Sequence, residues 1–92
     1  MNLRALTDGA VAGTGTVKVS RYLIGAVLIS TDGTNAASVT LQKDNASGKK
    51  IIEVSTKTPL FIDGYFSTEG SEYVYYSVSG TGASAQFFEC NP

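Results

Sequence analysis

The chain has 92 residues, a length that predicts a single domain, and 16% of them are charged, with a formal net charge of −1. One cysteine and no histidine exclude an intrachain disulfide, a structural zinc site and hydrolysis by a Ser-His or Cys-His pair. The near-zero net charge argues against electrostatic capture of nucleic acid or of an anionic membrane, and a charge-poor chain is typical of surfaces that make permanent contacts.

The first fifteen residues, MNLRALTDGAVAGTG, show no sustained hydrophobic period and contain three glycines. This composition predicts an extended N-terminal arm over residues 1–15, followed by a β-domain over residues 16–92. No apolar stretch follows Arg4, so we expect no secretory signal. The longest apolar run, residues 22–29, is far shorter than the ~20 residues of a membrane-spanning helix.

From residue 16 onward the sequence alternates between short apolar-rich runs and turns rich in glycine, aspartate and asparagine. Asp-Gly at residues 32–33 and again at 63–64 predicts turns, and Pro59 predicts an edge strand or a strand start after it. The predicted strands are residues 17–29, 37–43, 51–55, 60–62, 65–67, 73–78 and 83–89.

About seven to eight short strands at a spacing of ~8–12 residues predict an all-β fold. We expect a small antiparallel β-sandwich, jelly-roll-like or immunoglobulin-like, with the extended arm at its N-terminus. A small closed barrel is the alternative.

The run at residues 22–29 is apolar on both faces, whereas a strand with one face in water should be apolar on one face only. Simple alternation places Tyr22, Ile24, Ala26 and Leu28 on one face, and the residues around 73–76 and 87–88 behave similarly. The second face requires a cover, which is the arm, a neighbouring subunit or, for a central strand, a loop. A homo-oligomer is therefore expected, and the candidate interface residues are Leu3, Leu6, Tyr22, Ile24, Tyr73, Tyr75 and Phe87.

The residues that could carry chemistry have simpler explanations. Most of the acidic residues fall in predicted turns, where aspartate bonds to its own backbone, and Cys90 fits a small semi-buried thiol in a reducing cytoplasm. The loops at 32–35 and 44–45 offer oxygen ligands but lack the spacing of a calcium loop. We therefore expect no catalytic residues, no metal and no cofactor. The tyrosines, Tyr65 among them, are candidates for core packing, oligomer contacts or sugar platforms.

Three stretches carry a resemblance to a known class: IGAVLISTDGTNAASVTL at residues 24–41, SGKKII at 47–52 and YVYYSVSGTGA at 73–83. Over residues 17–89 the chain resembles the small β-sandwich virion proteins of tailed bacteriophages, of the capsid-decoration, capsid-cement or tail-associated type. The resemblance brings no functional residues with it, and nothing in it matches residues 1–15.

The resemblance implies a non-enzymatic subunit of the virion, assembled in the host cytoplasm. A decoration or cement subunit of this kind, commonly a trimer, would bind the major capsid protein or neighbouring virion proteins. The alternative is a tail- or fibre-associated module that contacts host-surface glycan or neighbouring tail proteins. Neither nucleic acid nor a membrane is expected as a partner.

Overall fold

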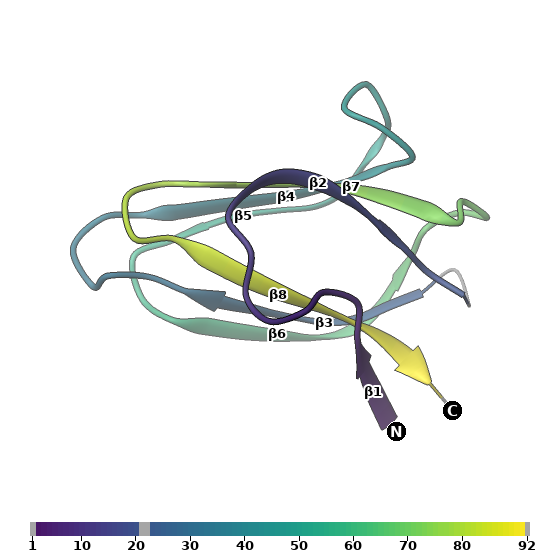
Figure 1. Ribbon diagram of the computed structural model, residues 1–92, viewed down its shortest axis with the longest axis horizontal. Coiled ribbons are helices and arrows are strands. Elements are labelled where there is room, and N and C mark those ends of the chain that lie inside the picture. Colours follow the sequence, from purple (N-terminus) through teal and green to yellow (C-terminus); the bar gives the residue numbers. More distant parts are fainter. Residues whose placement is uncertain (1, 21–22, 92) are drawn as a thin grey trace.

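The protein is an all-β sandwich of two four-stranded antiparallel sheets, as the sequence predicts (Figure 1). The computed structural model describes residues 2–20 and 23–91, and it contains no helix within those ranges. One sheet has the strand order β1-β8-β3-β6 and the other β2-β7-β4-β5. The strands are β1 (Asn2–Ala5), β2 (Gly13–Lys18), β3 (Leu23–Ser30), β4 (Ala37–Lys43), β5 (Lys50–Thr56), β6 (Leu60–Ser67), β7 (Tyr73–Ser79) and β8 (Ser84–Asn91).

The hydrophobic core lies between the two sheets and is built from aliphatic residues and one phenylalanine. Phe87 of β8 is the largest fully buried side chain, and its ring lies 5.3 Å from that of Tyr76 in the facing sheet. Both sheets supply alternate residues, as expected for strands with one face inward. The fully buried hydrophobic side chains of the core cluster are Val19, Ile24, Val27, Ile29, Ala37, Val39, Leu41, Val74, Ala85 and Phe87.

The segment expected to be an arm is instead part of the sandwich. Residues 2–5 form β1, which pairs with the C-terminal half of β8, and the predicted boundary at residues 15–16 falls inside β2, which pairs with β7. Between these strands Leu6 and Val11 donate backbone N–H bonds to β8 and pack against the core. Backbone pairing needs no hydrophobic alternation, so an edge strand can form from a sequence without a period.

The predicted turn at Asp63-Gly64 is also wrong, because β6 runs without interruption from Leu60 to Ser67. The two predicted strands 60–62 and 65–67 are one strand, which follows Pro59 and lies at the edge of its sheet, as the proline indicates. Asp-Gly favours a turn locally, but pairing with the central strand β3 keeps this segment extended. This correction matters for the surface described below.

The strand that is apolar on both faces, β3, is a central strand between β6 and β8. A register shift between Ile24 and Ala26 breaks the simple alternation, so that Ile24 faces the core together with Val27 and Ile29. Ala26 and Leu28 face outward. Ile24 therefore does not share a face with Ala26 and Leu28, because a β-bulge places one extra residue in the strand.

The turn between β3 and β4 is organised by Asp32. Its carboxylate accepts hydrogen bonds from the backbone N–H of Thr34 and Asn35 and from the Asn35 side-chain amide, at 2.7–2.9 Å. These bonds lower the pKa of Asp32 below its ordinary value of 3.8, and the bond from the Asn35 backbone has the largest effect. The carboxylate is thus part of the turn itself, which is the role that its sequence context predicts.

Replacing Asp32 with alanine is expected to lower stability at neutral pH, and the deficit should shrink in acid. A carboxyl group with a lowered pKa in the folded state contributes stability above its unfolded pKa, and this stability is lost as pH falls through the folded pKa. Urea unfolding of the native chain and of Asp32→Ala at pH 7 and pH 3 measures the difference. A deficit of the same size at both values would contradict this account.

Candidate interaction face

The two outward surfaces of the sandwich differ in chemistry. The outer side of the β2-β7-β4-β5 sheet is polar and consists largely of serine and threonine. Tyr75 lies half-buried there between Thr16 and Gln42, its cross-strand neighbours. The other outward residues of this side include Thr14, Lys18, Ser38, Thr40, Glu53, Ser55, Tyr73, Ser77 and Ser79. Such a surface is typical of one that meets water.

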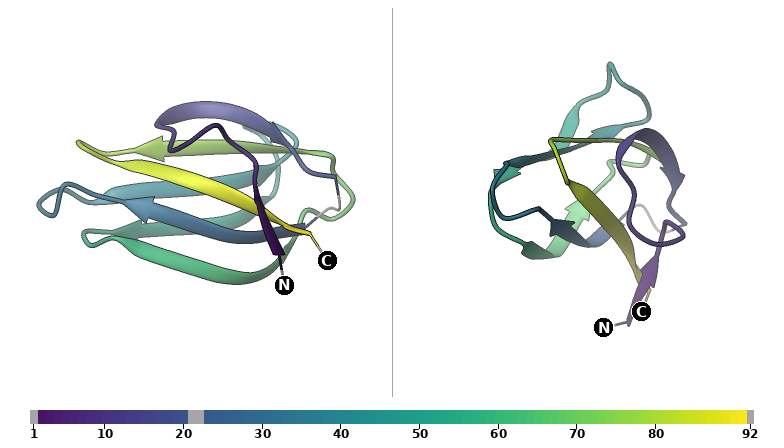
Figure 2. Two further views of the ribbon diagram at one scale, coloured as in Figure 1. Left: turned by 60° about the horizontal axis from the view of Figure 1, so that its bottom comes forward. Right: turned by 60° about the vertical axis from the view of Figure 1, so that its left-hand side comes forward.

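The outer side of the β1-β8-β3-β6 sheet is largely apolar, although Ser30, Ser84 and Gln86 also point outward there. We call it the apolar face; it is made of Leu3, Ala5, Ala26, Leu28, Phe61, Asp63, Tyr65 and Phe88. Four of the large hydrophobic side chains that are exposed in this protein lie here: Leu3 is 40% exposed, Leu28 38%, Phe61 51% and Tyr65 64%. Figures 1 and 2 show these four strands as one layer, with β1 against the end of β8. No described segment of the chain covers this layer from outside.

Cross-strand pairing makes the apolar face continuous. Leu28 lies opposite Phe61 on β6, and Ala26 lies between Asp63 of β6 and Phe88 of β8. Phe88 in turn lies opposite Ala5 of β1. The face therefore extends over all four strands, and contiguous exposed apolar surface of this kind marks a contact site.

The structure distributes the seven predicted interface residues over different environments. Leu3 lies on the apolar face, Tyr73 and Tyr75 lie on the polar one, and Leu6 is half-buried against the core. Tyr22 lies outside the described residues. Ile24 and Phe87 are fully buried inside the sandwich, so their apolar character is explained by the protein's own core and they contribute no exposed surface.

Sequence reasoning missed Leu28, Phe61 and Phe88 as members of an exposed face, and it named Tyr65 only among the tyrosines that could pack in the core, contact a neighbouring subunit or bind sugar. The signal was present in Phe61, Asp63 and Tyr65, which alternate at the period of a strand. Because a turn was predicted at Asp63-Gly64, Phe61 and Tyr65 were assigned to two separate strands and the common face of the three residues was not recognised. For Leu28 and Phe88, only the pairing of β3 with β6 and β8 shows which way they point.

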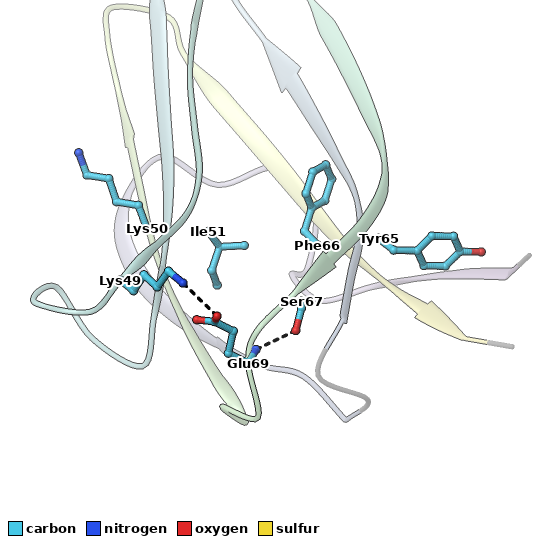
Figure 3. Close-up of a pocket in the computed structure, with 7 residues that line it drawn as sticks. All are labelled: Lys49, Lys50, Ile51, Tyr65, Phe66, Ser67 and Glu69. Atoms are coloured by element: carbon cyan, nitrogen blue, oxygen red, sulfur yellow. Dashed lines mark hydrogen bonds and ion pairs between the residues drawn. The ribbon is translucent and has the colours of Figure 1, made fainter.

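A pocket of about 300 Å³ lies between the start of β5 in one sheet and the end of β6 in the other (Figure 3). Ile51 and Phe66 supply its apolar wall, and Lys49 and Glu69 form an ion pair of 3.0 Å across its polar side. The hydrogen bond from Lys49 and then its charge lower the pKa of Glu69. The ring of Tyr65 points away from the other lining residues, toward the apolar face. Lys49 and Glu69 thus neutralise each other, and Lys50 pairs with Glu53, which lies outside the pocket. The exposed ring of Tyr65 belongs to a different surface.

A buried carboxylate lies at the end of the sandwich where β1 and β8 meet. Glu89 is 2% exposed and accepts hydrogen bonds from Arg4 Nη2 at 3.0 Å and from the Ser20 hydroxyl at 2.5 Å. Arg4 lies directly opposite Glu89 in the β1–β8 pair. The two neighbours of Arg4, Leu3 and Ala5, point to the opposite side, so this ion pair fixes the strand that contributes them to the apolar face.

Within residues 2–20 and 23–91, no group of three or more histidine, cysteine, aspartate or glutamate side chains could hold a metal ion. The same part of the chain contains no helix long and apolar enough to cross a membrane. A scan against protein-family models, a search of curated proteins and a search of solved structures each gave no match. The function therefore has to be inferred from the sequence and from the surfaces described above.

Proposed function

We propose that this protein is a non-enzymatic structural subunit that binds neighbouring proteins through its apolar face. The exposure of Leu28, Phe61 and Tyr65 on one sheet, opposite a polar sheet of serine and threonine, carries this proposal. Covering such side chains is favourable by about 25 cal/mol for each Å² removed from water. A subunit with one apolar and one polar face is suited to lie on another surface with its polar side outward.

The resemblance to small virion proteins of tailed bacteriophages suggests that the assembly containing this subunit is a virion. We propose a capsid decoration or cement protein, which stabilises the shell by burying surface against the major capsid protein and against further copies of itself. Stable protein interfaces bury on the order of 1,200–2,000 Å² in total. The apolar face supplies one side of such a contact, and several contacts around each subunit would resist the pressure of packaged DNA.

The proposal is tested by measuring the protein composition of the virions whose genome encodes this chain. Quantitative mass spectrometry should find the chain at a copy number comparable with that of the major shell protein. Phe61→Asp, which places a charge among the exposed apolar side chains at the β6 edge of the apolar face, should leave the folded chain intact but remove it from virions. Thr16→Asp on the polar face is the matched control and should be incorporated normally. Absence of the native chain from virions, or normal incorporation of Phe61→Asp, would overturn the proposal.

A second candidate is a tail- or fibre-associated module that contacts host-surface glycan. The exposed rings of Tyr65 and Tyr73 favour it, because aromatic faces stack on sugars. A glycan array distinguishes the two functions, since a binding module should give a signal that Tyr65→Ala or Tyr73→Ala abolishes. If the array shows no glycan binding and the chain is incorporated into virions, the glycan-binding module is excluded and the decoration subunit is supported.

A further inference from the structure

The outer side of the edge strand β6 carries an acidic residue between two aromatic ones. Phe61, Asp63 and Tyr65 occupy alternate positions, all three are exposed, and all point to the apolar face. Asp63 therefore has an aromatic residue on each side along the strand. Phe61 lies at the regular spacing of about 6.6 Å, and Tyr65 lies across the register irregularity that β6 has opposite residues 24–26. We call these three residues the acid–aromatic row.

The surroundings of Asp63 are apolar. Across the strand pair lies Ala26, whose small side chain is fully buried, and next to it Leu28 stands opposite Phe61. Asp63 is the charged residue of the apolar face, and no cation or hydrogen-bond donor contacts its carboxylate within the described part of the chain. By contrast, the three ion pairs among the described residues bring the carboxylates of Glu89, Glu69 and Glu53 within 3.0 Å of a cation.

This arrangement constrains whatever covers the apolar face. A carboxylate taken out of water without a partner is strongly unfavourable, and the apolar neighbours of Asp63 supply none. A surface that packs on Phe61 and Tyr65 must therefore bring a positive charge to the point between them. A second copy of the same face, packed face to face, would bring another carboxylate and no cation. Among the described residues the one arginine, Arg4, is already paired with Glu89, so we assign the complementary surface to a different protein.

We propose that the partner of the apolar face presents an arginine side chain to the acid–aromatic row. This inference rests on the proposed function, because it names the chemistry of the surface that the face binds. Arginine fits better than lysine because its planar guanidinium can pair with a carboxylate through two parallel N–H bonds. The same plane stacks on aromatic rings, with the cation within about 6 Å of a ring centre. An ammonium group is also attracted to an aromatic ring, but it forms neither the two parallel bonds nor the planar stack.

The inference is tested on the isolated protein with three short peptides, acetyl-Leu-Arg-Leu-amide and its counterparts with lysine or with citrulline at the centre. Citrulline keeps the planar shape of arginine but has no charge. Amide chemical shifts are recorded by NMR while each peptide is added. The arginine peptide should shift residues 61–65 and residues 26–28, and the lysine and citrulline peptides should each bind at least about fivefold more weakly.

Two variants locate the site. Asp63→Asn keeps the size and exposure of the side chain and should reduce binding of the arginine peptide about fivefold or more, to the level of the citrulline peptide. Asp8→Asn removes an exposed carboxylate in the loop between β1 and β2 and should leave binding unchanged. Equal binding of the three peptides, shifts that map elsewhere, or undiminished binding to Asp63→Asn would overturn the inference.

Failure here is distinguishable from failure of the proposed function. If the arginine peptide shows no preference while Phe61→Asp is still lost from virions, the apolar face binds a partner and the arginine inference alone is wrong. If the peptide binds as expected but virions lack the native chain, the arginine site stands and the virion function is wrong.

Discussion

Phe87→Ala is expected to lower the free energy of unfolding by about 3–5 kcal/mol, the usual range for truncating a buried phenylalanine to alanine. The side chain is fully buried between the sheets and contacts the ring of Tyr76. Removing it deletes a large apolar surface and leaves a cavity that rigid neighbouring strands cannot close. Urea or thermal unfolding followed by circular dichroism measures the loss. A domain of this size has a total stability of roughly 5–10 kcal/mol, so the variant should be close to the limit of folding.

The neighbouring residue is the matched control for this prediction. Phe88 has the same side chain but points to the apolar face and is only partly buried, so Phe88→Ala should cost about 1 kcal/mol in the isolated chain. Phe87→Leu provides a milder core change if the alanine variant does not fold. Equal losses for Phe87→Ala and Phe88→Ala would mean that the assignment of inward and outward residues in β8 is wrong.

Arg4→Ala is expected to cost about 2 kcal/mol, because it removes the cation that faces the buried Glu89. The usual penalty for breaking a buried pair is about 3–5 kcal/mol, and the 61% exposure of the Arg4 side chain reduces it, since water screens its charge. Glu89→Leu should change stability by less than about 1 kcal/mol, because it removes the buried charge as well as the pair. Adding Arg4→Ala to Glu89→Leu should then have little further effect.

Chemical denaturation of the four proteins in this cycle gives the coupling energy. Lys49→Ala, which breaks the exposed ion pair with Glu69, serves as the control and should cost about 0.5 kcal/mol or less. An Arg4→Ala loss as small as that of Lys49→Ala would show that water reaches Glu89. The cycle also bears on the apolar face, since β1 carries Leu3 and Ala5 of that face and Arg4 lies opposite Glu89 of β8.

The two sides of β3 are both apolar, but only one of them is buried in the core. Its inward residues, Ile24, Val27 and Ile29, are fully buried in the core, whereas Leu28 on its other side is left partly in water. Selection for stability of the isolated domain alone would favour a polar residue at Leu28, as at the outward threonine and serine positions of the other sheet. The leucine there, opposite Phe61, supports the proposal that a partner covers this face.

The sequence by itself determined the fold class and the number of strands to within one, and it predicted an edge strand or a strand start after Pro59, where β6 begins. These features depend on local period and turn chemistry, which short stretches of sequence contain. That the second face of the run at residues 22–29 is covered by a neighbouring subunit stays a prediction.

Only the tertiary structure decided where each side chain points. The bulge between Ile24 and Ala26 moves Ile24 to the core, and pairing with β3 keeps residues 63–64 extended, so that Phe61, Asp63 and Tyr65 share one side. It also joined residues 2–5 to β8, which turned an expected arm into a strand of the sandwich. The physical reason is the same in each case: strand pairing links residues that are distant in the sequence, and one shift in register moves a side chain from the core to the surface.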